Sequence, residues 1–404
     1  MGKGGEAAAP ATAAADPAPL RAAAETAGTG TPEAEAWRAR ATLAAGKDVR
    51  GVRRECPFGQ PRAGSAVDRW GKGLLRDPRD APILWLMASL AGYLAAAVPA
   101  VAWAGGGGRG HGAGALYLVG LNALFLQRFI LGMHYSAHRP LFRKGLPAGV
   151  GDWLNAVPVW VLAPFMGIPP GVYGLHHLIM HHGEDNAFPG DLSATEQYQR
   201  DNLGHFLVYW LRHTFLGLFE LPGYAWRKGR TGMFWKSVLV TVGYAVGTWG
   251  AWRLNPTATL WVVVLPFFVC SFALMFGNWS QHIFVDGSKP RSGYANTYNL
   301  ANNPDNMKAF NDGYHVLHHL DSKLHWSEFP EQFVARLDKM HANEALSFED
   351  ITFFEVGVFV FLGRLEYLAT KVITPHGRTQ SELVALMKRR LEPFIRESPR
   401  AKAA

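Results

Sequence analysis

Long apolar segments alternate along the chain with segments in which polar and charged residues gather. Four of the apolar segments hold about twenty residues each and almost no charge: residues 82–104, 115–133, 233–252 and 257–277. A helix rises about 1.5 Å per residue, so each segment is long enough to cross a hydrocarbon core of about 30 Å. Short polar loops join the first segment to the second and the third to the fourth. The pattern therefore predicts four transmembrane helices arranged as two hairpins.

The segments outside these runs divide the chain into three parts. Residues 1–67 are rich in Ala, Pro, Gly and Thr, and we expect a disordered tail there. Residues 68–345 contain the four runs and most of the histidines, and we expect them to form one membrane domain. Residues 346–404 are interpreted as an amphipathic helix followed by a basic tail. The predicted fold class is an all-α integral membrane protein with a histidine-rich cap on the cytosolic side.

Composition and charge agree with this fold class. Hydrophobic residues make up 49% of the 404 residues and charged residues only 18%, and 14 Trp are present, a residue that gathers at membrane interfaces. The net charge of +8 comes from Lys and Arg that flank the apolar runs without forming a nucleic-acid motif, so we expect no nucleic-acid partner. Two cysteines, Cys56 and Cys270, provide no disulfide framework.

The distribution of Lys and Arg also predicts an orientation. Basic residues precede the first run, follow the second, precede the third and follow the fourth, whereas the two opposite loops contain only Arg109 and Arg253. By the positive-inside rule, both termini and all the histidine clusters face the cytosol. The N-terminal residues include acidic side chains such as Glu6 and Asp16, which transit peptides avoid. The endoplasmic reticulum is therefore the predicted location, with a plastid membrane as the alternative.

Most of the 16 histidines lie in four clusters. The clusters are His134-Tyr-Ser-Ala-His138, His176-His177-Leu-Ile-Met-His181-His182, Asn278-Trp-Ser-Gln-His282 and His315-Val-Leu-His318-His319. If the four runs span the membrane, an even number of crossings separates every pair of clusters. All four clusters then lie on one face of the membrane, where they can meet.

The spacing within the clusters places imidazoles on common helix faces. Residues i and i+3, or i and i+4, of an α-helix project from the same side. His134 and His138 can therefore point at one metal ion. So can His177 and His181, with His182 turned toward a neighbouring ion.

The fourth cluster follows the same rule, because His315 can pair with His318 or with His319. Neutral imidazole is a common ligand of first-row metals, including iron. Nine convergent histidines exceed what one ion can use, so the sequence predicts two metal ions. We expect His176 to support the site rather than to bind metal, and the isolated His205 and His213 to be ordinary interfacial side chains.

These clusters resemble the histidine boxes of the membrane fatty acid desaturase superfamily, which also includes bacterial alkane hydroxylases. The boxes HYSAH, HLIMHH, NWSQH and HVLHH follow the family's order, and the resemblance covers about residues 80–345. It implies that nine histidines bind two iron ions and that an asparagine one helical turn before the third-box histidine holds a water near one iron. Mapped by motif, that asparagine is Asn278. The implied ligands are His134, His138, His177, His181, His182, His282, His315, His318 and His319.

The resemblance also implies an activity: an enzyme that uses O2 and two external electrons to introduce a double bond into a fatty acyl chain or acyl lipid, with iron cycling between Fe2+ and Fe3+. The implied electron donor is cytochrome b5, or ferredoxin in a plastid. No flavin or nicotinamide motif is visible in the sequence, and neither is the His-Pro-Gly-Gly signature of a fused cytochrome b5 domain. Among the acidic residues near the boxes, we expect Asp312, three residues before His315, to orient a ligand imidazole.

Three other functions share some of these features. The second box has the spacing H-x-x-x-H-H, which also occurs in alkane hydroxylases, so a lipid or alkyl hydroxylase on the same scaffold is the nearest alternative. A membrane zinc hydrolase needs only about three protein ligands and one open position. A bis-histidine haem protein that carries electrons would not need nine histidines either. A content of two irons per chain distinguishes the desaturase and the hydroxylase from the zinc hydrolase and the haem protein.

Overall fold

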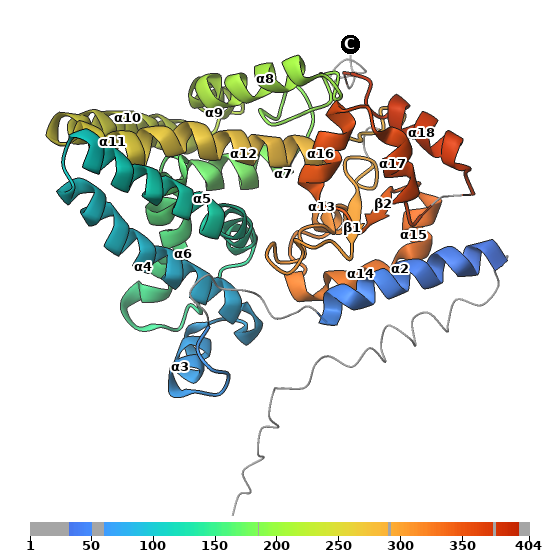
Figure 1. Cartoon of the computed structure of the whole chain (residues 1–404), viewed down its shortest axis with the longest axis horizontal. Helices are drawn as coiled ribbons and strands as arrows, with labels where there is room; N and C mark the ends of the chain where they lie inside the picture. The colour runs from blue at the N-terminus through green and yellow to red at the C-terminus, as the bar shows by residue number, and fades with distance from the viewer. Residues whose placement is uncertain (1–31, 51–59, 185, 290–291, 375–376, 396–404) are drawn as a thin grey trace, which may run out of the picture.

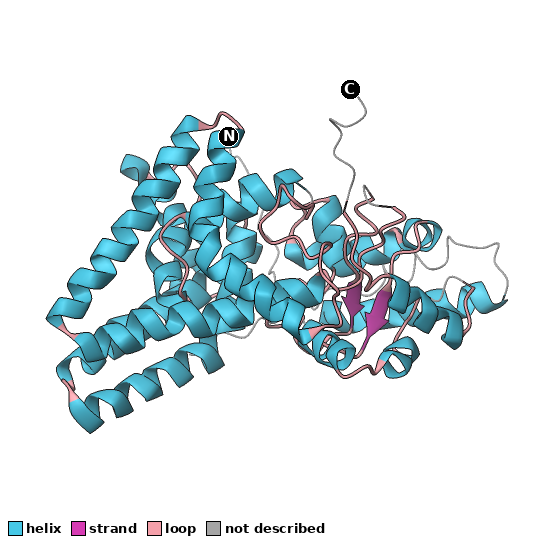
Figure 2. Cartoon of the chain, turned by 90° about the horizontal axis from the view of Figure 1, so that it is seen from above, coloured by secondary structure: helices cyan, strands magenta, loops and turns pink. Residues whose placement is uncertain are grey.

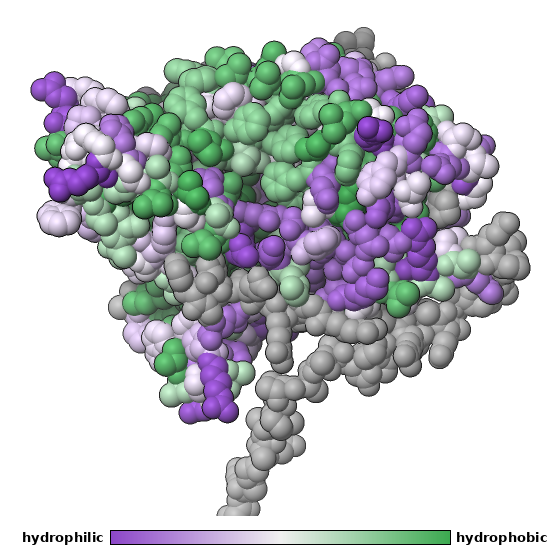
Figure 3. Space-filling view, in the orientation of Figure 1, coloured by the Kyte–Doolittle hydropathy of each residue, from purple (hydrophilic) through white to green (hydrophobic). Residues whose placement is uncertain are grey.

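The computed structural model describes residues 32–50, 60–184, 186–289, 292–374 and 377–395. The described chain is mostly helical, with the long helices together at one end and a cap of shorter helices at the other (Figures 1 and 2). The long helices are α4 (Ala81–Trp103), α5 (Gly107–His138), α10 (Thr231–Leu254) and α12 (Leu265–Gln281). A short helix, α11 (Pro256–Thr259), continues into α12 through a π-helical turn at Leu260–Val264. In Figure 3, apolar side chains predominate over the long helices and polar ones over the cap.

Among the described residues, three helical stretches are long and apolar enough to cross a membrane: Pro78–Trp103, Gly107–His138 and Pro256–Gln281. They correspond to the first, second and fourth predicted runs. The third run forms α10, but Lys236 and several glycines and tryptophans make this helix less apolar than the other three. The arrangement of four spans in two hairpins therefore stays a prediction.

Helix α5 packs against both α4 and α12. The Tyr93 hydroxyl of α4 donates to the Tyr117 carbonyl of α5 at 2.7 Å, and the two rings stack with centroids 5.9 Å apart. Near the start of α5, Gly114 lies so close to the Trp261 ring that an added Cβ would come within 2.1 Å of it. Since α5 and the α11–α12 stretch begin side by side and run in the same direction, their C-terminal ends also meet. The first and third histidine clusters lie at these two ends.

The remaining helices are short. In chain order they are α3 (Ala66–Leu74), α6 (Val150–Val157), α7 (His182–Glu184), α8 (Leu203–Leu211), α9 (Gly217–Arg227), α13 (His315–Leu320), α14 (Phe329–Ala335), α15 (Leu337–Ala342), α16 (Phe353–Phe361), α17 (Leu365–Thr370) and α18 (Gln380–Arg389). Further π-helical segments lie at Pro158–Leu162, Gly174–His181 and Arg212–Leu216. Helices α13 to α18 make up most of the cap (Figure 1).

The C-terminal part of the chain is built into this cap. Strand β2 (Ser347–Glu349) pairs in parallel with β1 (Asn299–Ala301), which places Phe348 opposite Leu300 in a buried apolar cluster. The structure therefore differs from the prediction of an amphipathic helix after residue 345, because the described residues of this segment form one strand and three helices. It shares a core with the part of the chain before it. Residues 396–404 of the predicted basic tail lie outside the described residues.

The N-terminal part also differs from the prediction of a disordered tail, because residues 32–50 form helix α2 (Pro32–Arg50). The alanine-rich face of α2 is buried against α14. Near the end of α2, Asp48 accepts a hydrogen bond of 2.6 Å from the Tyr314 hydroxyl. This contact fastens the helix beside the fourth histidine cluster. Residues 1–31 and 51–59 of the predicted tail lie outside the described residues.

Candidate metal centre

The first histidine cluster occupies the last turn of α5. His134 and His138 are four residues apart, and their ring centroids lie 5.2 Å apart on one side of the helix, as the spacing predicts. The helix ends at His138 because Arg139 adopts an extended backbone before Pro140, and the residue before a proline disfavours the helical conformation.

The second cluster lies on a π-helical segment, Gly174–His181, and not on an α-helix. Hydrogen bonds in a π-helix join residues five apart, and here the His182 N–H donates to the His177 carbonyl. Side chains five apart are therefore neighbours, and the Nε2 atoms of His177 and His182 lie 3.2 Å apart. The α-helical pairing predicted from the sequence, His177 with His181 and His182 turned away, does not match this geometry.

The third cluster lies at the C-terminal end of the long helix α12, and the fourth lies on a short helix of the cap. His282 is the first residue after α12, and its N–H donates to the Asn278 carbonyl at 3.0 Å. The fourth cluster forms α13, in which the adjacent rings of His318 and His319 are inclined by 81°. These two neighbours therefore face different sides of the centre.

Seven of the nine predicted ligands fall into two groups, and the ligand nitrogens of each group lie within 4.8 Å of one another. The first group contains His134, His138, His177 and His318, and the second contains His181, His282 and His319. Within the first group, the Nε2 atoms of His134 and His318 lie 2.9 Å apart, as do those of His138 and His177. Imidazoles from four separate segments thus converge in two adjacent sets.

The other two predicted ligands stand beside these groups. His182 lies next to His177 of the first group. The ring centroid of His315 lies 4.9 Å from that of His319 and 5.2 Å from that of His282, both in the second group. Each group therefore has one further imidazole within reach.

The free nitrogens fit metal ions. The Nε2 atoms of His282 and His319 are buried, yet neither has a hydrogen-bond partner among the described residues. An unpaired buried polar atom costs about 1–3 kcal/mol, which a bound metal would offset. Two nitrogens bound to one ion at about 2 Å, with a right angle between the bonds, lie about 3 Å apart. The closest Nε2 pairs in the first group have this separation, so the residues present suit two ions.

Burial keeps these imidazoles uncharged. The pKa values of His177, His318 and His319 are lowered well below the ordinary value, first by burial and then by the neighbouring imidazoles. The same causes lower the pKa of His182 to about 2. Neutral imidazole is the form that binds metal, so these four side chains are available as ligands at physiological pH.

The second group is oriented by residues that sequence reasoning missed. The Nδ1–H of His181 donates to Oδ2 of the buried Asp191 at 2.6 Å, and the Nδ1–H of His282 donates to the Asn296 carbonyl at 2.9 Å. Both bonds leave Nε2 as the free acceptor, the usual arrangement around metal-binding histidines. Asp191 lies ten residues after His181 in an irregular segment, and no spacing rule points to it. The Pro-Gly pair before it marks only a turn.

Three further side chains complete the surroundings. His176, predicted to support the site, lies with Nε2 3.5 Å from Oδ1 of Asp191. The ring of His213, predicted to be an ordinary interfacial side chain, packs against His176 at 5.4 Å and faces the interior. In the first group, the Tyr173 hydroxyl lies 3.0 Å from Nδ1 of His134.

Asp312, the acidic residue predicted to orient a ligand, is buried between the two groups. Its Oδ1 lies 3.6 Å from Nδ1 of His315 and 4.0 Å from Nε2 of His134. The Gln281 side chain donates to its other oxygen. Asp312 is thus placed beside the ligands, with His315 as its nearer imidazole neighbour.

Asn278, the predicted water-holding residue, is fixed by two hydrogen bonds. Its amide nitrogen donates to the Tyr209 hydroxyl at 2.7 Å and to the Ser193 carbonyl at 3.2 Å. These bonds occupy the amide nitrogen and set the direction of the carboxamide oxygen. Asn278 also lines a cavity beside the two histidine groups.

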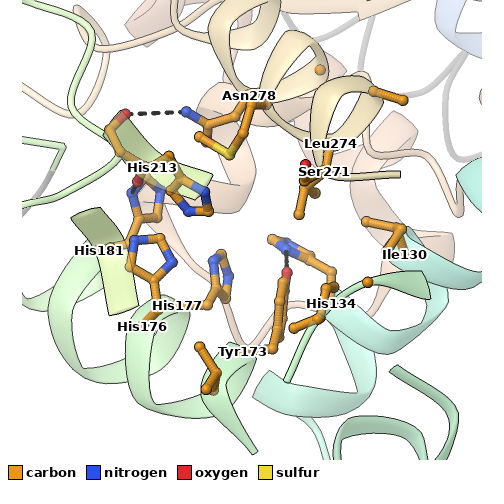
Figure 4. A pocket seen from close by; sticks show the side chains of 18 of the residues that line it. Ile130, His134, Tyr173, His176, His177, His181, His213, Ser271, Leu274 and Asn278 are labelled. Atoms are coloured by element: carbon orange, nitrogen blue, oxygen red, sulfur yellow. Dashed lines mark hydrogen bonds between the residues drawn. The ribbon is translucent and has the colours of Figure 1, made fainter. Parts of the chain in front are cut away.

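A cavity of 260 Å³ runs from the histidines toward the apolar helices. Members of both groups lie at its polar end, with Asn278 and Asp312. Its apolar wall includes Leu126, Ile130, Ile168, Val172, Leu274 and Met275. Figure 4 shows His177 and His181 on one side of this space and Ile130, Ser271 and Leu274 on the other. A concave, mostly apolar space with a few convergent polar groups is typical of a ligand site.

The comparison with protein families gives one match. The model of the fatty acid desaturase family matches residues 110–348, which are more than half of the chain and include all four histidine clusters. Neither the curated proteins nor the solved structures contain a match. The family match confirms the resemblance that the histidine boxes indicate.

Proposed function

The chain belongs to the fatty acid desaturase family, and on that premise we propose that it is a membrane-bound di-iron enzyme that uses O2 to introduce a double bond into a fatty acyl chain or acyl lipid. The observation that carries this proposal is that histidines of both groups line the same mostly apolar cavity. An alkyl chain lying along the apolar wall would present one of its methylenes to the histidines.

The proposed reaction removes one hydrogen atom from each of two adjacent methylenes. One O2 takes up these two hydrogens together with two electrons and two protons from outside. The products are one alkene and two waters. Two bound iron ions supply the oxidising power that attacks an unactivated C–H bond, which no amino acid side chain can do. The protein has to hold the ligands, place the alkyl chain and keep bulk water away.

The chain's residues divide this work. The four histidines of the first group, joined by His182, would hold one iron, and the three of the second group, joined by His315, would hold the other. Asp191 and Tyr173 act as positioning residues, since each engages the Nδ1 of a ligand and leaves its Nε2 toward the metal. Asp312, whose Oδ1 lies 3.6 Å from Nδ1 of His315, would position this ring by its charge and not by a direct hydrogen bond.

Asn278 has a separate role in the proposal. With its nitrogen held by Tyr209 and Ser193, its carboxamide oxygen accepts a hydrogen bond from a water beside the second group. The apolar wall opposite keeps other water out. A dry site strengthens the electrostatic interactions within it and protects the oxidant from side reactions.

The family and the three apolar helices indicate an integral membrane protein. We propose in addition that α10 is a fourth span and that the histidines face the cytosol in the endoplasmic reticulum, with a plastid membrane as the alternative. The outward-facing Leu239, Val242 and Val246 of α10 support a lipid-facing position. The electron donor is accordingly cytochrome b5, or ferredoxin in a plastid.

A hydroxylase is the second candidate, supported by the H-x-x-x-H-H spacing of the second box. It would use the same two irons, one O2, two electrons and two protons. One oxygen atom would enter a C–H bond to give an alcohol, and the other would leave as water. The product therefore separates the two candidates.

Expression in a host that lacks the product, followed by mass spectrometry of its lipids and metal analysis of the purified protein, tests the proposal. We expect about two irons per chain and a new double bond, both lost in His318→Ala and both kept in His205→Ala, which changes an exposed histidine outside the groups. A new hydroxyl would assign the hydroxylase. A single zinc, or activity that persists in His318→Ala, would contradict the proposed centre.

A further inference from the structure

A second cavity, of 310 Å³, lies at the end of α5 where the chain leaves the first histidine cluster. Its lining residues come from the chain after α3, from the end of α5 and from Lys323 after α13, and backbone hydrogen bonds join the first two of these segments. The Arg76 N–H donates to the Leu141 carbonyl at 2.7 Å, and the Arg143 N–H donates to the Leu74 carbonyl at 3.2 Å. These bonds hold the chain after α3 against the chain after α5, so that the basic residues of both gather at one opening.

The opening carries a net positive charge. Arg76, Arg139 and Lys323 line it together with Asp77 and Asp80. Both carboxylates are engaged by neighbouring donors. The Arg79 guanidinium lies 2.8 Å from Asp77, and the Trp326 indole N–H donates to Asp80 at 2.9 Å.

One of the three cations at the opening is engaged. Arg139 donates to the Lys323 carbonyl at 2.6 Å, and its Nη2 lies 3.7 Å from Oδ2 of Asp77. The side chains of Arg76 and Lys323 are exposed, and within the described ranges neither has an ion-pair partner. Arg143 and Lys144 are exposed nearby. The rim therefore presents cations to solvent, while its carboxylates are neutralised from within.

One of the predicted metal ligands lines this cavity. His138 lines it, and His138 is partly exposed whereas the other three histidines of its group are buried. Its Nε2 lies 2.9 Å from that of His177. The cavity shares no lining residue with the apolar cavity beside Asn278, which reaches the centre through other histidines. His138 thus connects the basic surface with the first group from the side that an alkyl chain does not use.

We propose that this basic opening is the docking site of an acidic one-electron carrier protein, which seats its redox centre over His138. The inference rests on the proposed function, because that reaction needs electrons from outside the chain. Each docking delivers one electron, so two dockings oxidise two reduced carriers for every O2 consumed. A lipid head group fits less well, because its chain would have to reach the apolar cavity by another route.

Charge complementarity of this kind speeds association and weakens in salt. The test is a binding titration of the full chain in nanodiscs of neutral lipid with two probes, the soluble domain of cytochrome b5 and a plant-type ferredoxin. For the double variant Arg76→Glu/Lys323→Glu we expect the Kd of the preferred carrier to rise by about tenfold or more at low salt, with a flatter salt dependence. The matched control, Lys388→Glu/Arg389→Glu on α18, makes the same charge change at exposed residues of the cap and should leave Kd unchanged.

Equal affinities of the double variant and the control would overturn the proposal. In a parallel titration of the purified chain with vesicles of anionic lipid, a double variant that loses its binding to these vesicles but keeps its affinity for the carrier would also overturn it, because the opening would then belong to the membrane surface. Carriers that fail to bind the unaltered protein, while a chemical reductant supports turnover, would overturn it as well. A failure of the proposed function looks different: the carriers would bind, but neither they nor the chemical reductant would yield an oxidised lipid.

Discussion

His181 and Asp191 are joined by a buried hydrogen bond of 2.6 Å between Nδ1 and Oδ2. The other carboxylate oxygen of Asp191 accepts from the N–H and the hydroxyl of Ser193, at 2.8 and 2.9 Å. The carboxylate therefore cannot turn away, and the imidazole it holds keeps Nε2 directed at the second group. A residue outside every histidine box thus fixes the orientation of a ligand.

Replacing Asp191 with asparagine should weaken the second metal site. An amide accepts a weaker hydrogen bond than a carboxylate, and in one of its two orientations it would present N–H groups to the Nδ1–H of His181. Losses of such supporting contacts typically reduce metal affinity or activity about 10- to 100-fold. We expect Asp191→Asn to lose iron on dialysis against a chelator at concentrations that leave the unaltered protein loaded. Full iron retention and full activity would contradict the assignment.

The matched control for this change is Asp201→Asn, ten residues further along the chain. Asp201 is exposed and accepts a hydrogen bond from the Gln199 side chain, away from the centre. The control should retain iron and melt like the unaltered protein. A loss of iron in both variants would point to a general effect of removing a carboxylate, and not to the orientation of His181.

Removing the metal should destabilise the fold. The buried nitrogens of His282 and His319 have no partner among the described residues, so metal binding offsets their desolvation and stabilises the folded state by mass action. We expect chelation to lower the Tm by several degrees, since a few kcal/mol corresponds to a shift of that size. Adding Fe2+ under reducing conditions should restore it. In His319→Ala the chelator-induced shift should shrink, and a shift as large as in the unaltered protein would remove His319 from the metal site.

The sequence predicts those features of the centre that follow from local spacing. The run at residues 82–104 corresponds to α4 within one residue, and the run at residues 115–133 lies within the longer α5, because long apolar runs have few alternative structures in a membrane. The four boxes also converge, as the even number of crossings between them predicts. Each apolar run and each histidine box is itself a pattern within about twenty residues.

The features that the sequence does not predict depend on contacts between distant segments. The π-helical hydrogen bonding at Gly174–His181 moves His182, and not His181, next to His177, and the residue pattern there fits an α-helix equally well. Helix α2 is held by Asp48 and Tyr314, which lie 266 positions apart in the chain. A composition rich in Ala and Pro indicates no such partner, so the tail was expected to stay disordered.

The depth of the apolar cavity should determine which acyl chains are accepted. Asn122 lines the cavity twelve residues before His134 on α5, which corresponds to about 18 Å along the helix. A phenyl ring at this position would shorten the space, so we expect Asn122→Phe to shift the product profile toward shorter chains at unchanged iron content. The neighbouring change Ala123→Phe places the same ring on an exposed, outward-facing position and should not alter the profile. Identical profiles for the two variants would show that the substrate does not reach this depth.

The ion pair between Arg390 and Asp286 should stabilise the cap, and it should do so in a pH-dependent way. Nη2 of Arg390 lies 2.9 Å from Oδ2 of Asp286, and the two side chains are 1% and 5% exposed. Removing one member of a buried pair costs about 3–5 kcal/mol because the other charge stays buried. We therefore expect Arg390→Met to unfold at a clearly lower urea concentration. The double variant Asp286→Leu/Arg390→Met should recover part of the loss, because no charge is left unpaired.

The sign of the pH effect follows from the pKa of Asp286. Burial alone would raise this pKa, but the hydrogen bonds from Ser288 and the charge of Arg390 outweigh burial and lower it below the ordinary value. The folded state therefore binds a proton less readily than the unfolded chain, so the contribution is complete above the ordinary Asp range and is lost as the pH falls through the lowered pKa. In Arg390→Met the pKa loses one of the groups that lower it, so acidification should cost this variant less stability than it costs the unaltered protein. Urea unfolding curves measured between neutral pH and the acid limit of the detergent-solubilised protein would show this difference, and parallel pH profiles would contradict it.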